Sequence, residues 1–160
     1  MKKETHIRYE YFKDRSALNG MEQQLLDKAR EARAKAYAPY SNFLVGCAVL
    51  LENGEIHTGS NQENAAFPSG LCAERTAIFW ISANFPDVRV KKIFVVGGPR
   101  ISQEAHPPIP PCGGCRQSLM EYETKQQENI ELYFASMNDE VYKVDAIKDL
   151  LPFYFDGTFL

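Results

Sequence analysis

Two short segments bring three cysteines and one glutamate into a pattern that constrains this chain more than any other feature. The first segment is Cys72-Ala73-Glu74, and the second is Pro111-Cys112-Gly113-Gly114-Cys115. Structural zinc is normally held by four protein ligands, whereas catalytic zinc is held by three and keeps one position for water. Three thiolates with a carboxylate two residues after the first therefore predict a catalytic zinc site, with Glu74 as its acid/base group.

Two other interpretations of these cysteines remain open from the pattern alone. Cys112-Gly113-Gly114-Cys115 by itself is typical of a redox dithiol or of half a structural zinc knuckle. A redox pair does not require Cys72, and a structural site needs a fourth ligand, for which His106 is the nearest candidate. Cys47 lies within an apolar segment and is interpreted as a small buried hydrophobic residue.

Length and charge limit the class of protein. The 160 residues predict one domain over residues 1–160, in which residues 1–20 form an N-terminal extension that no pattern assigns. The net charge is −3 and no basic run reaches about five to eight residues, so nucleic acid is not an expected partner. No apolar run reaches about 18 residues and the start lacks an apolar signal region, so no membrane is expected and the location is predicted to be cytoplasmic.

Hydrophobic periodicity predicts helices that alternate with strands. Helices are expected over 21–37, from Cys72 to Asn84, and over 113–122, and strands over 43–51, 55–59, 93–96, 130–135 and 140–144. Asn53-Gly54 predicts a tight turn between the first two strands. The link 136–139 is too short for a parallel crossover, so the last two strands are expected to be antiparallel.

The predicted helices place all three cysteines at helix starts. Cys72 is expected at the N-terminus of one helix, and Cys112 and Cys115 in the first turn of the next. A helix N-terminus carries about half a positive charge and free N–H groups, which lower the pKa of a thiol. Two such ends directed at one metal would offset part of the negative charge of three thiolates.

Five segments in this order are similar to the cytidine deaminase family, in the small homo-oligomeric form that acts on free nucleosides. These segments are Ala38 to Gly46, Asn61 to Ala65, Cys72 to Ala77, Pro111 to Gln117, and Leu150-Leu151-Pro152 with Phe155. The resemblance implies a three-layer α/β/α sandwich with a five-stranded mixed sheet whose last two strands are antiparallel. It also implies a homotetramer with active sites shared between subunits.

The same resemblance implies roles for the metal-site residues. Cys72, Cys112 and Cys115 would hold one zinc ion per subunit and leave a fourth position for water. Glu74 would pass protons between this water, the ring nitrogen N3 and the leaving amine, and Arg75 would offset charge at the metal. The implied reaction is hydrolytic deamination of free cytidine and 2′-deoxycytidine to uridine and deoxyuridine, in pyrimidine salvage.

The resemblance implies a substrate-binding set as well. Asn61 and Glu63 would bind the ribose. Phe43 would pack on the pyrimidine, and the Ala73 N–H would bind the carbonyl oxygen of the pyrimidine. Phe67 and Phe155 would complete the pocket, in their own subunit or a neighbour's. Phe67 stands where many relatives have Tyr, and Gly114 where Ala is usual. Two alternatives remain, a deaminase for a nucleoside antibiotic such as blasticidin S and a non-catalytic protein whose zinc stabilises an interface.

Overall fold

The structure is a computed structural model that describes residues 1–101 and 106–160. Three α-helices occur in these residues, α1 (Gly20–Arg33), α2 (Ala73–Asn84) and α3 (Gly113–Gln126). The strands in the same part of the chain are β1 (Glu10–Phe12), β2 (Phe43–Leu51), β3 (Ile56–Ser60), β4 (Val90–Pro99), β5 (Glu131–Ala135) and β6 (Val141–Val144). Two short 3₁₀ helices, η3 (Ile147–Leu150) and η4 (Gly157–Phe159), belong to the C-terminal segment.

The described strands form one mixed sheet in the order β1-β6-β5-β4-β2-β3. Only β4 and β5 pair in parallel among them, and β5 and β6 are antiparallel as predicted. The prediction of five strands is wrong, because β1 adds a sixth by pairing with β6 from Glu10 opposite Lys143 to Phe12 opposite Val141. This strand has three residues, two of them exposed, so it lacks the alternation that identifies a strand in a sequence.

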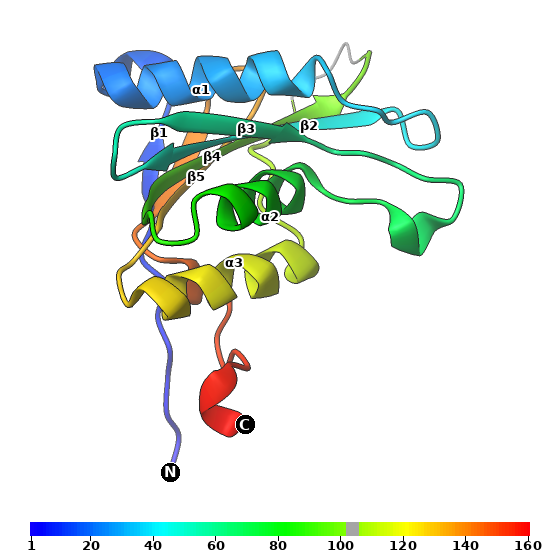
Figure 1. The fold of residues 1–160 in the computed structure, drawn as a ribbon. Helices are drawn as coiled ribbons and strands as arrows, with labels where there is room; N and C mark the ends of the chain where they lie inside the picture. The colour runs from blue at the N-terminus through cyan, green and yellow to red at the C-terminus, as the bar shows by residue number, and fades with distance from the viewer. Residues whose placement is uncertain (102–105) are drawn as a thin grey trace.

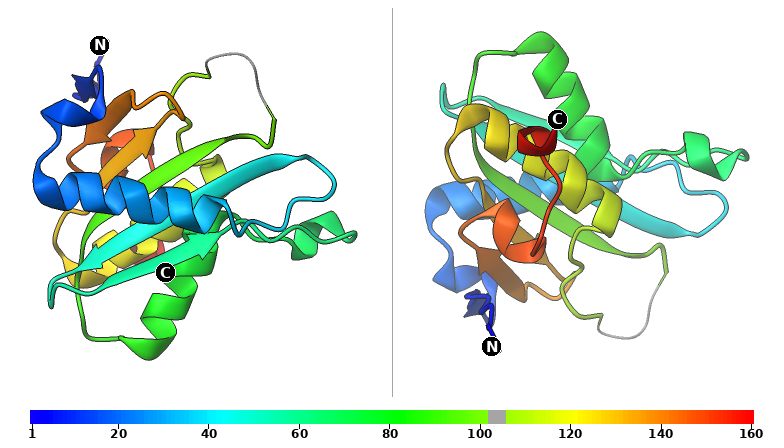
Figure 2. Two further views of the ribbon diagram at one scale, coloured as in Figure 1. Left: turned by 90° about the horizontal axis from the view of Figure 1, so that it is seen from above. Right: turned by 90° about the horizontal axis from the view of Figure 1, so that it is seen from below.

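Helices cover both faces of this sheet, with α1 on one face and α2 and α3 on the other (Figure 1). Alternate residues of a strand point to opposite faces, and β4 shows this directly. Phe94 and Val96 pack in the apolar cluster that contains Leu25 of α1, while Ile93 and Val95 pack in the cluster of α2 and α3. The two remaining views show α1 crossing the sheet on one side and α2 and α3 lying together on the other (Figure 2).

Helix α1 begins where local chemistry favours it and ends earlier than predicted. The Asn19 side chain accepts from the Glu22 N–H, and the Glu22 side chain accepts from the Asn19 N–H, which is a capping box. The helix ends at Arg33 and not at Tyr37. The Tyr37 N–H instead donates to the Asn61 carbonyl at 3.0 Å, and the Tyr37 carbonyl accepts from Glu63 at 2.8 Å. This pairing removes Tyr37 from the helix and fixes the segment that follows β3.

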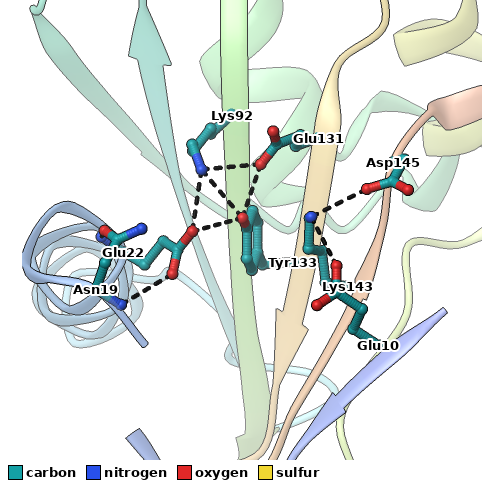
Figure 3. A network of polar contacts seen from close by, with 8 residues as sticks. All are labelled: Glu10, Asn19, Glu22, Lys92, Glu131, Tyr133, Lys143 and Asp145. Atoms are coloured by element: carbon teal, nitrogen blue, oxygen red, sulfur yellow. Dashed lines mark hydrogen bonds and ion pairs between the residues drawn. The ribbon is translucent and has the colours of Figure 1, made fainter. Parts of the chain in front are cut away.

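A network of charged side chains ties α1 to the middle of the sheet (Figure 3). Lys92 Nζ lies 3.0 Å from a carboxylate oxygen of Glu22 and 2.8 Å from one of Glu131. The Tyr133 hydroxyl lies 2.7 Å from an oxygen of each carboxylate. At the edge of the sheet, Lys143 forms an ion pair with Glu10 at 2.8 Å, which helps to hold β1.

Two glycines in the sheet allow helices to approach closely. A methyl group on Gly46 of β2 would overlap the backbone of α1 at Ala29 and Arg33. A methyl group on Gly59 of β3 would lie 2.6 Å from the Ala73 carbonyl oxygen of α2. Gly46 therefore lets α1 pack closely on β2, and Gly59 lets the N-terminus of α2, where Cys72 lies, pack closely on β3. Within the described residues, no helix is long and apolar enough to cross a membrane.

Candidate metal centre and active site

The fold brings the three predicted cysteine ligands together at two helix starts. Cys72 is the N-cap of α2, Cys112 is the N-cap of α3, and Cys115 lies in the first turn of α3. Their sulfur atoms all lie within 4.8 Å of one another. Among the residues described, this cluster contains no histidine, so His106 does not complete a four-ligand site in it.

The spacing of the sulfurs fits a zinc ion. Thiolates bind zinc at about 2.3 Å in a tetrahedral arrangement, which separates two sulfurs by about 3.8 Å. The Cys72 and Cys112 sulfurs are 3.9 Å apart. Three soft donors at this spacing can hold zinc and leave the fourth tetrahedral position open.

One cationic side chain, Arg75, lies beside the sulfurs and can offset part of the negative charge that three thiolates would carry. Arg75 Nη2 donates to Cys72 Sγ at 3.8 Å. A hydrogen bond from Cys115 and the contact with Arg75 lower the pKa of Cys72 to about 5, although burial opposes the change. The same contact raises the pKa of Arg75. The pKa of Cys115 is raised by its hydrogen bond to Cys72 and by its burial.

Glu74 lies in the first turn of α2, two residues after Cys72, and its carboxyl group interacts with Cys72 and Cys115 of the cluster. Its side chain is buried, with 4% of the residue exposed. Burial raises the pKa of Glu74, and the charge on Cys72 adds to this. A buried carboxyl group of this kind beside a metal can accept and return protons, which is the chemistry of a general acid/base.

A cavity of about 480 Å³ lies beside Cys72, within the size range of ligand pockets. It is lined by Tyr40, Ser41, Asn61, Gln62, Glu63, Asn64, Phe67, Gly70, Leu71, Cys72 and Arg75. Asn61, Glu63 and Phe67 were predicted to bind substrate, and Cys72 and Arg75 to form the metal centre. The other six lining residues were missed. Four of these six residues lie inside the segments that carry the family resemblance, which was the available signal: Tyr40, Ser41, Gln62 and Asn64.

The polar side chains of the cavity are fixed by bonds within the chain. Asn61 Oδ1 accepts from the Val45 N–H at 2.8 Å, and Asn61 Nδ2 donates to the Phe43 carbonyl at 2.8 Å. Glu63 accepts from the Tyr40 N–H at 2.9 Å and from the backbone and hydroxyl of Ser41. The bond from the Ser41 hydroxyl is the main reason that the pKa of Glu63 is lowered. Both side chains therefore stand in fixed orientations at the cavity wall.

Three predicted binding residues are not among those that line this cavity in the described part of the chain. Phe43 is half-buried at the start of β2, and Ala73 is buried as the first residue of α2. Phe155 lies in the C-terminal segment, is 57% exposed, and stacks on Phe159 with ring centres 5.4 Å apart. Cys47 is buried in β2, away from the sulfur cluster, as its apolar surroundings predicted.

Comparison with known proteins agrees with this arrangement. Residues 20–128 match the model of the cytidine and deoxycytidylate deaminase zinc-binding region. The chain belongs to this deaminase family. It is 32% identical over 130 residues to a cytidine deaminase of Halalkalibacterium halodurans, covering 81% of this chain and 90% of that one. It is 35% identical over 130 residues to a cytidine deaminase of Sporosarcina psychrophila, covering 81% and 88%.

A solved structure extends the family assignment to the fold. The crystal structure of cytidine deaminase from Burkholderia pseudomallei is 40% identical, with a TM-score of 0.71, and the match covers 83% of this chain and 98% of that chain. The cytidine deaminase resemblance recognised in the sequence is therefore confirmed, as is an α/β fold with a mixed sheet. As a cytidine deaminase family member, the protein is an enzyme of the hydrolytic deaminase class.

Proposed function

We propose that this protein is a zinc-dependent enzyme that hydrolyses free cytidine and 2′-deoxycytidine to uridine and deoxyuridine and serves pyrimidine salvage. The observation that carries the proposal is the group of three sulfurs within 4.8 Å of one another, together with the buried carboxyl group of Glu74 that interacts with two of the cysteines. Cys72 and Arg75 of this centre also line a cavity of about 480 Å³. The reaction replaces the exocyclic C4–N bond by a C4–O bond and releases ammonia.

The side chains at the centre divide the chemistry between them. Cys72, Cys112 and Cys115, whose sulfurs lie within 4.8 Å of one another, would hold one zinc ion per subunit. The ion would lower the pKa of water and so supply hydroxide at neutral pH. Glu74 would accept one proton from water and transfer it to ring nitrogen N3. It would then take the second proton from the hydroxyl group added at C4 and deliver it to the leaving amino group. Arg75, which donates to Cys72, offsets the charge of the thiolates.

Two residues of the cavity wall and two residues outside it supply the contacts to the nucleoside. Asn61 and Glu63 bind the ribose, and Glu63 accepts a hydrogen bond from its 3′-hydroxyl. They use the oxygen lone pairs and the amide hydrogen that are not engaged in hydrogen bonds within the chain. Phe43 packs on the pyrimidine, and the Ala73 N–H binds its carbonyl oxygen. None of these contacts requires a 2′-hydroxyl, which is why both nucleosides are proposed as substrates.

Glu63 favours a free nucleoside over a polynucleotide. Its pKa is lowered, so it is a carboxylate at neutral pH. In a nucleic acid the 3′ oxygen carries a phosphodiester, which has no proton to donate and brings negative charge close to this carboxylate. Nucleic acid is therefore not a proposed substrate or partner.

Assembly and location complete the proposal. Residues 1–160 form one catalytic domain that assembles into a homotetramer in the cytoplasm. Phe67 and Phe155 are 73% and 57% exposed, and we assign them to active sites that neighbouring subunits share. Exposed aromatic side chains of this kind are typical of interfaces between subunits.

A turnover assay before and after removal of metal tests the proposed function. The zinc-loaded protein should convert cytidine and 2′-deoxycytidine, lose activity on treatment with a chelator, and recover it when zinc is restored. Blasticidin S and a single-stranded oligodeoxynucleotide serve as competing substrates and should react far more slowly. A protein that holds zinc and leaves both nucleosides unchanged would contradict the proposal, as would one that deaminates without regard to metal.

A further inference from the structure

Two side chains tie the turn that carries Cys112 and Cys115 to the C-terminal segment. Arg116 Nη1 donates to the Leu150 carbonyl at 3.0 Å, and Gln117 Nε2 donates to the Phe155 carbonyl at 2.8 Å. The C-terminal segment leaves the body of the fold on the side of the sheet that α3 covers (Figure 1). The two residues that directly follow the last cysteine therefore both bind this segment.

Arg116 also holds the backbone on both sides of Cys112. Its side-chain Nε donates to the Pro111 carbonyl at 2.8 Å, and its backbone N–H donates to the Cys112 carbonyl at 3.0 Å. The first carbonyl belongs to the peptide group before Cys112 and the second to the peptide group after it. Because both groups are held by one residue, a rotation about the backbone bonds of Cys112 would break one of the two hydrogen bonds.

Cys112 depends on such support more than the other ligands do. It is exposed, whereas Cys115 is buried and Cys72 is half-buried, so packing contributes least to its orientation. Its side chain forms no capping hydrogen bond to α3. Pro110 and Pro111 precede it and lack an N–H group, so this lead-in cannot be fixed by backbone donors of its own.

The Leu150 carbonyl, which accepts from the Arg116 guanidinium, is itself held in place. Leu150 ends η3, and the start of η3 is bound to α3 by the buried carboxylate of Glu123. Glu123 accepts from the Ile147 N–H at 2.7 Å and from the Lys148 N–H at 3.2 Å. Arg116 and Glu123 are seven residues apart and so lie on one face of α3. The Leu150 carbonyl is therefore a fixed point for the guanidinium.

We propose that Arg116 is a positioning residue for the metal centre, which fixes Cys112 against the C-terminal segment and thereby supports zinc binding. The inference rests on the proposed role of the three cysteines as zinc ligands. The planar guanidinium presents separate donors to Pro111 and Leu150 at once, whereas a lysine ammonium is a single point charge at the end of a flexible stem. Lysine should therefore not replace arginine here, although it keeps the charge.

Metal competition in the zinc-loaded protein tests this role without an activity assay. Arg116→Lys and Arg116→Gln should bind zinc about 10–100-fold more weakly against a chromophoric chelator, as is typical for loss of an outer partner of a ligand. In the same samples, mass spectrometry should show alkylation by iodoacetamide that increases first at Cys112. Arg89→Lys is the matched control, because Arg89 forms an exposed ion pair with Glu128, and it should bind zinc as the parent does.

Several results would contradict the positioning role of Arg116. Zinc affinity within twofold of the parent in both variants would overturn it, and so would equal increases in alkylation at all three ligands. Loss of the folded state in both variants, seen by circular dichroism, would show that Arg116 is a general structural residue instead. A parent that binds no zinc contradicts the proposed function and this inference together, whereas a parent that binds zinc no more tightly than the variants contradicts the inference alone.

Discussion

At the scale of single residues, Glu74 is the side chain whose environment is hardest to explain by structure alone. It is 4% exposed, and burial raises its pKa, so its charged form is less favourable there than in water. A glutamine of the same shape would avoid this cost. A buried carboxyl group beside the cysteine cluster fits the acid/base role that we propose for Glu74.

Glu74→Gln is therefore expected to keep the fold and the zinc and to lose turnover of cytidine by at least about 10²–10⁴-fold, the usual contribution of general acid–base catalysis. The amide preserves shape and polarity but cannot accept or return the proton. The measurement is kcat together with zinc content by atomic absorption. Glu121→Gln on the exposed face of α3 is the control and should match the parent. Turnover of Glu74→Gln within tenfold of the parent would remove Glu74 from the mechanism.

At the scale of elements, substitution by alanine is expected to change the free energy of unfolding in opposite directions at Gly46 and at Gly114. A methyl group on Gly46 would overlap the backbone of α1, whereas nothing lies within 4 Å of one on Gly114 in α3. Gly46→Ala should lower the free energy of unfolding by about 1–3 kcal/mol through overpacking. Gly114→Ala should raise it by up to about 1 kcal/mol, because alanine has the higher helix propensity.

Urea unfolding followed by circular dichroism measures both glycine variants. Gly20→Ala provides a control, since a methyl group there also meets nothing within 4 Å but lies at the first residue of α1. A Gly46→Ala protein as stable as the parent would contradict the close contact of α1 with β2. Destabilisation by Gly114→Ala would contradict the open space around the first turn of α3.

Helix starts could be predicted from the sequence, as could the end of α2 at Asn84, whereas the ends of α1 and α3 could not. Cys72 and Cys112 precede apolar residues at helical spacing, so the N-caps of α2 and α3 were predictable from local sequence. The end of α1 depends on Tyr37, whose backbone pairs with Asn61 and Glu63 far along the chain. The same long-range pairing explains why the cavity residues beside Asn61 were only partly predicted.

At the scale of the whole molecule, the C-terminal segment exposes aromatic side chains that a separate subunit would leave in water. Phe153 is 100% exposed, and Phe155 and Phe159 stack on each other while remaining 57% and 69% exposed. Deleting residues from Phe153 onward is expected to lower cytidine turnover and shift the assembly to smaller species. Zinc content should stay unchanged, because Leu150 and its bond to Arg116 remain.

Light scattering coupled to gel filtration gives the mass of the truncated assembly, and kcat is measured on the same fractions. Phe79→Ala on α2 is a control for loss of an exposed aromatic residue outside this segment. A truncated protein that keeps both the mass and the turnover of the parent would contradict a shared active site completed by Phe155.

The network that joins α1 to the sheet makes stability depend on pH (Figure 3). Burial alone would raise the pKa of Glu22, but hydrogen bonds from Tyr133, the Asn19 backbone and Lys92 outweigh it and lower the pKa. Burial would also raise the pKa of Glu131, but hydrogen bonds from Lys92 and Tyr133 outweigh this effect and lower the pKa. A carboxyl group with a lowered pKa in the folded state stabilises the fold above its unfolded pKa, and this contribution is lost as pH falls through the folded value.

Glu22 is therefore expected to increase the free energy of unfolding at neutral pH. This contribution should be lost in acid, below the ordinary glutamate pKa of about 4.3. Glu22→Gln should be less stable than the parent at pH 7 and should lose less stability between pH 7 and pH 3, because the amide does not titrate. Urea unfolding at a series of pH values measures both effects. Glu10→Gln, which removes the exposed partner of Lys143, should change the profile little. A Glu22→Gln profile parallel to that of the parent would show that the three-way contact with Lys92 and Tyr133 does not stabilise the folded chain.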